Sequence, residues 1–191
     1  RRMSRQLEAP EEVEARLAAQ QPRAYHPRLL RLVRRNSASA VSGYNQVEIL
    51  QDTTEFYPRL LDDLRRAQHH LHLQYYIWTD DEFTRQVQAI LIERARAGVK
   101  VRILYDAGTR RAMGEAYIEA LCQAGVEVLP YLAYNSLRTL HLANYRCHRK
   151  ITVIDGRVGY LGGMNLDQEQ MPGRLWPTWR DTQVRITGDA V

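Results

Sequence analysis

The sequence predicts an α/β fold in which a central mixed, mostly parallel sheet is flanked by helices. Three observations support this prediction. From about Gln46 onward, strand-like and helix-like patterns alternate along the chain, which is typical of layered α/β domains. Hydrophobic residues make up 45 % of the 191 residues, enough for an ordinary globular core. The pair Asp155-Gly156 separates two short apolar runs, as in a β-hairpin.

The chain divides into three stretches. Residues 1–35 are charged and helical in pattern, and Pro10 followed by two glutamates suits a helix start. Residues 36–45 are small, polar and turn-prone, so we expect a linker. Residues 46–191 would form the α/β domain. No internal repeat is present in the sequence.

The segment 27–35 reads PRLLRLVRR and predicts an amphipathic helix. Leu29, Leu30 and Val33 share one face of this helix, whereas Arg28, Arg31 and Arg35 share another. Two interpretations remain open. The helix can dock on its own domain, which we favour, or it can lie on an anionic membrane.

The α/β domain begins with a short predicted strand at 47–50. Thr53 or Thr54 can cap the following helix, whose buried face carries Phe56, Leu60, Leu64 and Ala67 at helical spacing. The run 70–78 predicts a second strand. Together these elements give the first β-α-β unit of a layered fold.

A second helix-strand pair follows immediately. Asp80 or Asp81 can cap a helix whose buried face carries Phe83, Val87, Ile90 and Leu91, and Gly98 would end it. Residues 99–105 alternate as in a strand. A helix at 111–124 ending at Gly125 and a strand at 126–129 complete the pattern.

Charge and cysteine content restrict the functional classes. Lys plus Arg number 27 and Asp plus Glu number 22, for a net charge of +5, which permits binding to nucleic acid or anionic lipid. Only Lys100 and Lys150 are lysines. The two cysteines form no disulfide framework, so a reducing compartment is the simpler interpretation. No apolar run approaches the roughly 20 residues of a membrane span.

The most informative segment is 145–165, YRCHRKITVIDGRVGYLGGMN, which predicts a hairpin of strands 150–154 and 158–161. Strand periodicity places His148 and Lys150 on one face and Arg149 on the other. Imidazole can attack phosphorus or carry a proton, and an ammonium can bind a phosphate oxygen. Each of these residues alone would more often be structural, but together they indicate a phosphate site.

The spacing His148-x-Lys150-x4-Asp155-Gly156, followed by Gly162-Gly163-x-Asn165, resembles the HKD signature of the phospholipase D superfamily. The segments YNQVEILQD, LHLQYYIWTDDE, RARAGVKVRILYDAG and WRDTQVRITGDAV extend the resemblance. They are most similar to the amino-terminal catalytic half of bacterial cardiolipin synthases. Gln170 and Thr84 depart from this pattern, because Tyr and Gly are usual at the two positions. The resemblance implies a phospholipase D-like layered fold.

The resemblance also implies a two-step phosphodiester exchange through a phosphohistidine. His148 would be one of two catalytic histidines, either the nucleophile or the general acid and base. Lys150 and Asn165 would bind phosphate oxygens. Asp155 would support the motif and orient the imidazole, and Glu169 is a second candidate for that orientation. Gly162 and Gly163 would lie behind the site, and no metal or other cofactor is implied.

Only one HKD motif is present, whereas the superfamily's site needs two halves. We expect a fragment whose second half lies in a missing C-terminal part, although a homodimer partner could also supply it. The expected activity converts phosphatidylglycerol to cardiolipin plus glycerol at the bacterial cytoplasmic membrane, peripherally or on its cytoplasmic side. An isolated single-motif chain could be inactive.

Two other functions remain open. The first is a homodimeric HKD phosphodiesterase acting on nucleic acid, which is less favoured because no basic-aromatic binding track is visible. The second is an inactive half-site that binds lipid phosphate. A metal site at His69, His70 and His72 is disfavoured, because no carboxylate or cysteine follows at ligand spacing.

Overall fold

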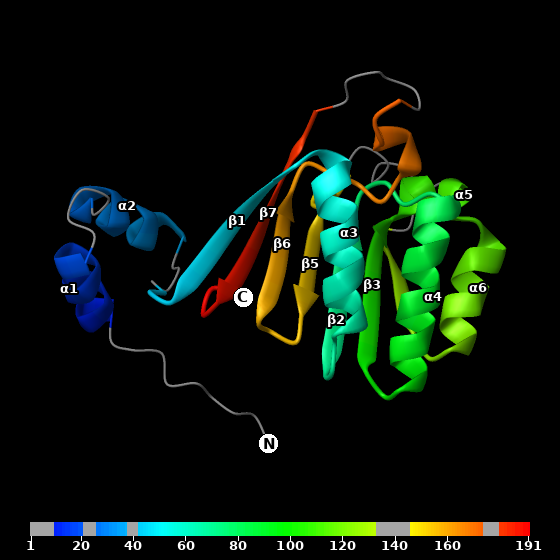
Figure 1. The fold of residues 1–191 in the computed structure, drawn as a ribbon, viewed down its shortest axis with the longest axis horizontal. Helices are drawn as coiled ribbons and strands as arrows, with labels where there is room; N and C mark the ends of the chain where they lie inside the picture. The colour runs from blue at the N-terminus through cyan, green and yellow to red at the C-terminus, as the bar shows by residue number, and fades with distance from the viewer. Residues whose placement is uncertain (1–9, 21–25, 38–41, 133–145, 174–179) are drawn as a thin grey trace. The chain divides into compact units, whose positions relative to one another are not determined.

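Seven strands form one sheet in the order β1-β7-β6-β5-β2-β3-β4 in a computed structural model (Figure 1). The structure describes residues 10–20, 26–37, 42–132, 146–173 and 180–191. The chain separates into two compact units, one of residues 1–46 with 188–190 and one of residues 47–187 with 191. The candidate site residues all belong to the second unit.

Three strands at one end of the sheet run parallel. They are β2 (His70–Tyr75), β3 (Lys100–Asp106) and β4 (Glu127–Tyr131). Helix α4 (Glu82–Arg96) links β2 to β3. The short η1 (Ala107–Thr109) and helices α5 (Arg110–Met113) and α6 (Glu115–Gln123) link β3 to β4. These crossovers have the length that parallel neighbours need.

The prediction of a mostly parallel sheet is wrong, because the other strands pair antiparallel. Strands β5 (Ile151–Ile154), β6 (Val158–Gly162) and β7 (Thr182–Gly188) pair antiparallel, and β5 also pairs antiparallel with β2. A tight turn joins β5 to β6, and such a connection can only join antiparallel strands. The α/β class and the mixed sheet are confirmed, but parallel pairing is confined to one half.

Helices α3 (Asp52–Arg65), α4 and α6 lie along one face of the sheet (Figure 1). Alternation along the strands sends every second side chain into this interface. The expected helical faces are buried there, and Phe56, Leu60, Leu64, Val87 and Leu91 are all fully buried. This layer fixes the frame on which the site is built.

Several element boundaries differ from expectation, and most strands shift by one or two residues. Gln51 is the N-cap of α3, so neither Thr53 nor Thr54 caps it, and both lie inside the first turn. The cap of α4 is as predicted, since Asp81 is one of the two aspartates expected there. The predicted helix at 111–124 is broken at Gly114, whose φ of 78° does not fit a helix. The strand predicted at 70–78 ends at Tyr75.

The first unit contains helices α1 (Pro10–Gln20) and α2 (Pro27–Ser37). Helix α2 extends two residues into the predicted linker, and strand β1 (Asn45–Gln51) begins at the linker's last residue. In the part of the chain that the structure describes, no helix is long and apolar enough to cross a membrane.

Candidate active site

The hairpin of β5 and β6 sets the position of the motif. Asp155 and Gly156 both have positive φ, at 54° and 60°, as a type I′ turn requires. The amide of Arg157 donates to the carbonyl of Ile154 at 3.0 Å and closes the turn. His148 and Lys150 therefore stand at the opposite end of β5, immediately before its first residue.

His148 and Lys150 lie side by side, as strand periodicity predicts. The Lys150 Nζ lies 3.0 Å from each ring nitrogen of His148 and 3.0 Å from the His148 carbonyl oxygen. The ammonium can donate to whichever ring nitrogen carries the lone pair. His148 is exposed, whereas Lys150 is only 2 % exposed. A buried cation thus lies against an imidazole that solutes can reach.

The surroundings of Lys150 act on its charge in opposite directions. Burial lowers the pKa of the Lys150 ammonium overall, although the nearby Asp181 carboxylate acts to raise it. Asp181 precedes β7, and its amide donates to the Asp52 carboxylate at 3.0 Å. Sequence reasoning missed Asp181 as part of this environment, although it lies in the WRDT segment that carries the resemblance.

Asp155 has different neighbours from those expected. Its carboxylate accepts hydrogen bonds from the amides of Gln68, His69 and His70, at 2.7 to 2.8 Å. Burial opposes ionisation, but these three amides lower the pKa of Asp155 overall. Among the described residues no bond joins Asp155 to His148, which lies at the other end of β5. The observed contacts therefore do not support an orienting role, and they anchor the hairpin to the start of β2 instead.

Asn165 is held by its backbone and by its side-chain oxygen. Its amide donates to Gln170 Oε1 at 2.9 Å, and its Oδ1 accepts from the Ile77 amide at 3.0 Å. The Tyr57 hydroxyl donates to the Asn165 carbonyl at 3.0 Å and lies 2.8 Å from the Asp167 carbonyl. These contacts fix the position of Asn165, and the Gln170 side chain takes part in them. The Asn165 Nδ2 has no partner in the described part of the chain, so it can serve a phosphate oxygen.

Gly162 and Gly163 allow the start of β7 to approach closely. A Cβ on Gly163 would lie 2.1 Å from Asp181 Oδ1, and one on Gly162 would lie 2.4 Å from the Thr182 carbonyl oxygen. A larger residue at 163 would therefore displace the Asp181 carboxylate from the neighbourhood of Lys150. The pair has a steric role behind the site.

Glu169 lies in the short helix η3 (Gln168–Gln170), with its side chain exposed. Its amide donates to Asp167 Oδ1 at 2.9 Å. No hydrogen bond joins Glu169 to His148 within the described ranges. The structure thus does not bring this candidate together with the imidazole.

Asp106 fixes the approach to the motif, and sequence reasoning missed it. Its buried carboxylate accepts from Arg146 Nε at 2.7 Å and from the Cys147 amide at 3.0 Å. Asp106 is the last residue of β3. Ligand sites in α/β sheets form at the carboxyl ends of parallel strands, so this position could have identified Asp106 as a candidate site residue. The Tyr76 ring lies 4.6 Å from the His148 ring between centroids and bounds the imidazole.

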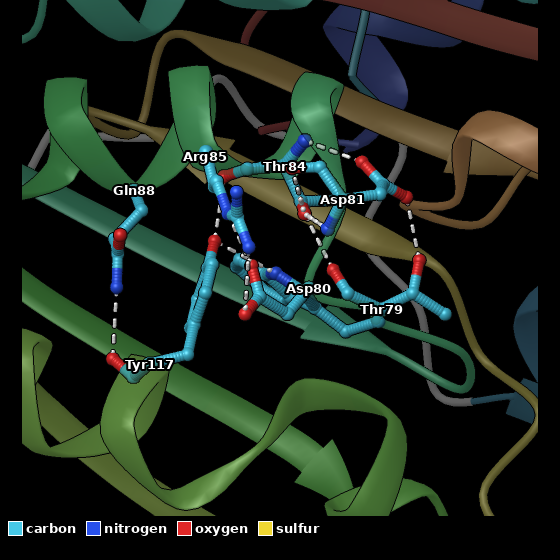
Figure 2. A network of polar contacts seen from close by, with 8 residues as sticks. Thr79, Asp80, Asp81, Thr84, Arg85, Gln88 and Tyr117 are labelled. Atoms are coloured by element: carbon cyan, nitrogen blue, oxygen red, sulfur yellow. Dashed lines mark hydrogen bonds and ion pairs between the residues drawn. The ribbon is translucent and has the colours of Figure 1, made fainter.

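A denser polar network lies at the start of α4 (Figure 2). The Asp81 carboxylate accepts from the Thr84 amide at 2.8 Å, from the Thr79 hydroxyl at 2.6 Å and from the Gln168 amide at 2.8 Å. Thr84 Oγ1 in turn accepts from the Asp81 amide at 2.9 Å, which completes a capping box. This network ties α4 to the segment that follows Asn165.

Metal binding finds no support in the described ranges, where no group of three His, Cys, Asp or Glu residues is arranged to hold an ion. His70 and His72 do share a face, with ring centroids 4.8 Å apart. Two cations lie at the Tyr76 ring beside His148, namely Lys150 and Arg146, and the Arg146 guanidinium is paired with Asp106.

Comparisons with known proteins agree with this geometry. The family model described as "Cardiolipin synthase, PLD-like domain" matches residues 60–175. Cardiolipin synthase of Geobacillus kaustophilus is 42 % identical over 172 residues, which cover 89 % of this chain and 34 % of that protein. The major cardiolipin synthase of Bacillus subtilis is 37 % identical over 158 residues, covering 82 % and 33 % respectively. The chain thus spans about a third of the length of these curated relatives.

Solved structures show the same fold at low identity. A phospholipase D family member, Nuc from Salmonella typhimurium, has a TM-score of 0.55 and 17 % identity, and the match covers 76 % of this chain and 84 % of that one. Phosphatidylserine synthase of Haemophilus influenzae has a TM-score of 0.58 and 16 % identity, covering 75 % and 33 %. With its family match over more than half of its length, the chain belongs to the cardiolipin synthase family of phospholipase D-like domains.

Proposed function

We propose that this chain supplies one half-site of a phosphatidyltransferase that makes cardiolipin and glycerol from phosphatidylglycerol. One observation carries the proposal: the buried Lys150 ammonium lies 3.0 Å from the ring nitrogens of an exposed His148. A buried cation holds its charge at a fixed point and loses little of its field to water. The imidazole beside this cation could attack a bound phosphodiester. The negative charge that grows on the phosphate oxygens during the attack would then lie next to the ammonium.

The reaction takes two displacements at phosphorus. In the first, an imidazole nitrogen bonds to phosphorus, the bond to the glycerol oxygen breaks, and a second histidine gives that oxygen its proton. In the second, that histidine removes a proton from the hydroxyl of another phosphatidylglycerol, whose oxygen bonds to phosphorus as the bond to nitrogen breaks. His148 is one of the two histidines, and the other belongs to a second HKD half on a longer chain or a second copy.

The other motif residues divide into two groups. We assign Lys150 and the Nδ2 of Asn165 to the non-bridging oxygens, since an ammonium and an amide NH₂ both donate hydrogen bonds. Asp155 and the glycines hold the hairpin and β7 in place, and the nearby Asp181 carboxylate offsets part of the effect of burial on the Lys150 ammonium. Glu169 makes no hydrogen bond to His148 among the described residues, so no contact supports its orienting role. No metal is needed, because the ammonium supplies the positive charge.

The partners follow from the substrate. Phosphatidylglycerol is an anionic lipid, so the enzyme works at a membrane surface, here proposed to be the bacterial cytoplasmic membrane. The net charge of +5 favours such a surface.

The test begins with the coding sequence beyond the codon for Val191, where a second His-x-Lys-x4-Asp in frame would supply the other half. The complete gene product and the 191-residue chain are then incubated with labelled phosphatidylglycerol vesicles, and cardiolipin and glycerol are quantified. We expect equal amounts of both products from the complete protein. A phosphatidyl adduct on a motif histidine, found by mass spectrometry, would identify the nucleophile.

His148→Ala in the complete protein should abolish turnover, whereas His69→Ala, an exposed histidine of the α3–β2 connection, should leave it intact. Cardiolipin formation that persists in His148→Ala would refute the proposal. Cleavage of DNA without cardiolipin formation would establish the phosphodiesterase alternative instead. Phosphatidylglycerol binding without any turnover would establish an inactive half-site.

A further inference from the structure

Tyr76 follows β2 directly, and its ring lies against three side chains of the candidate site. The ring centroids of Tyr76 and His148 are 4.6 Å apart, with their planes tilted by 54°. The Lys150 Nζ and the Arg146 Cζ each lie over the same ring, 5.3 Å from its centroid. All four residues belong to the second unit, so their arrangement is fixed within one compact body.

The pairing of β2 with β5 brings these side chains together. Gln74 is paired with Ile151 in the antiparallel register of the two strands. The chain that follows Gln74 and the chain that precedes Ile151 therefore leave the ladder at the same end. Tyr76 comes to lie beside His148 and Lys150 for this reason.

The Tyr76 backbone is held on both sides. Its carbonyl accepts a hydrogen bond from Thr109 Oγ1 at 3.0 Å. The next amide, that of Ile77, donates to Asn165 Oδ1 at 3.0 Å. The Tyr76 hydroxyl, by contrast, has no hydrogen-bond partner in the part of the chain that the structure describes. A role of the side chain in the site therefore falls to its ring.

The two residues expected to orient the imidazole do not contact it. Asp155 lies at the other end of β5, and no hydrogen bond joins Glu169 to His148 within the described ranges. The side chains that do lie against the imidazole are those of Lys150 and Tyr76. An aromatic ring suits this place, because its negative face attracts cations within about 6 Å, yet it carries no net charge that would repel a phosphodiester.

We propose that Tyr76 is the positioning residue of this half-site. Its ring restricts the rotation of the His148 imidazole and attracts the Lys150 ammonium, so that the two stay side by side when a phosphodiester binds. The hydroxyl takes no part, and Tyr76 does not contact the phosphate. This inference rests on the proposed function for the reaction that the ring assists, whereas the contact between the ring and the imidazole can be measured without turnover.

The first test compares two variants of the complete protein, Tyr76→Phe, which keeps the ring, and Tyr76→Leu, which removes it. A misplacement of about 1 Å can cost about 10²-fold in rate, so Tyr76→Leu should lower kcat for cardiolipin formation by about 10- to 100-fold. Its KM should stay within about 2-fold of wild type, because no contact with the substrate is lost. Tyr76→Phe should keep both constants within about 2-fold.

Tyr44→Leu is the matched control. Tyr44 also has a guanidinium over its ring, that of Arg16 at 3.9 Å, but it belongs to the first unit. Its loss should leave kcat unchanged. Tyr76→Met is a second variant without a ring, and thermal unfolding of every variant would identify any loss of kcat that is due to unfolding.

The second test needs no turnover. NMR spectra of the 191-residue chain report the ring current of Tyr76 on the imidazole protons of His148, whose signals are assigned by comparison with His148→Ala. These signals should be displaced by the ring in wild type and in Tyr76→Phe, and the displacement should vanish in Tyr76→Leu. Titration with inorganic phosphate should give similar affinities for all three proteins, because Tyr76 does not contact the anion.

Unchanged His148 signals in Tyr76→Leu would overturn the inference, whatever happens to kcat. Equal losses of kcat in Tyr76→Phe and Tyr76→Leu would also overturn it, by showing that the hydroxyl acts on the substrate. A raised KM or weaker phosphate binding with kcat unchanged would make Tyr76 a binding residue instead. If the complete protein never makes cardiolipin, the proposed function fails, and the NMR comparison alone decides whether Tyr76 positions the imidazole.

Discussion

Two polar clusters lie beyond the carboxyl end of β2, and they use their polar groups differently. Around Asp81, the two carboxylate oxygens accept three hydrogen bonds, and the Asp81 amide donates one to Thr84 Oγ1 (Figure 2). Around His148, the buried Lys150 ammonium has an imidazole and a carbonyl as its partners, and no carboxylate bonds to it in the described ranges. The first cluster is satisfied internally, whereas the second is incomplete until an anion enters.

The difference separates groups that stabilise the fold from groups reserved for chemistry. A buried network with every member bonded rigidifies its surroundings. A buried cation without an ion-paired carboxylate costs free energy, and its lowered pKa reports that cost. Since the folded protein disfavours the charged form, the cost is present at neutral pH and disappears only as the pH rises through the folded pKa towards the unfolded value.

The largest expected effect comes from Lys150→Met, which tests the incomplete cluster. Loss of one fixed positive group at the developing charge should lower kcat for cardiolipin formation by about 10²- to 10³-fold. Thermal unfolding should occur at the same or a higher temperature, because the variant no longer buries a charge. Assays of the complete protein and calorimetry would measure the two quantities.

Lys100→Met is the matched control, since Lys100 is the chain's other lysine and is exposed at the start of β3. It removes the same charge and should change neither kcat nor the unfolding temperature. A large loss of stability in Lys150→Met would show that the His148–Lys150 cluster stabilises the fold. The two clusters would then not differ in the way proposed.

Asp81→Ala should give the opposite result. It removes the helix cap and leaves the Thr84 and Gln168 amides without their acceptor, at a cost of about 3 kcal/mol of unfolding free energy. Activity measured well below the unfolding temperature should fall far less than in Lys150→Met. Urea unfolding would give the free energy.

The neighbouring Asp80 provides the control for this substitution. Its bond to Arg85 lies at the surface, where such pairs contribute less than about 1 kcal/mol, so Asp80→Ala should be nearly neutral. Equal losses in the two variants would mean that the Asp81 network contributes no more than a surface ion pair.

Whether the sequence predicts a contact in these clusters depends on how far apart its two residues are along the chain. The aspartate cap of α4, the hairpin turn and the juxtaposition of His148 with Lys150 follow from local periodicity, and the structure confirms all three. Asp106 and Asp181 could not be assigned in this way, because their positions depend on strands far apart in sequence. The parallel bias was wrong for the same reason, since pairing of β5 with β2 is decided by tertiary packing.

Asp155 belongs to the HKD motif, but its carboxylate is fully engaged with backbone amides, as that of Asp81 is with its own partners. Asp155→Asn should lower the unfolding free energy by about 2 kcal/mol, since three amides lose a charged acceptor. Asn tolerates the positive φ of this position, so the backbone is not strained. Asp62→Asn, an exposed change on α3, should cost much less.

The difference in unfolding free energy between wild type and Asp155→Asn should change with pH in one direction. The folded pKa of Asp155 is depressed, so its stabilisation is complete above the unfolded pKa of about 4 and is lost as the pH falls through the folded value. The stability gap between wild type and Asp155→Asn should therefore be constant near neutrality and should narrow below about pH 4. Urea unfolding at a series of pH values would reveal it, and a gap that widens on acidification would contradict the assignment.

The smallest expected effect is that of Tyr57→Phe, which acts on the backbone of Asn165 and Asp167. The Tyr57 hydroxyl bonds to the carbonyls of Asn165 and Asp167, so its loss should cost about 1 kcal/mol of unfolding free energy. Because Asn165 binds phosphate oxygens in the proposed mechanism, a small displacement of its backbone should also lower kcat several-fold. Tyr160→Phe removes a comparable buried hydroxyl, bonded to Asp63, and should lower stability without lowering kcat. If both variants left kcat unchanged, the satisfied network would support the fold alone, and Asn165 would owe its position to Gln170 and Ile77.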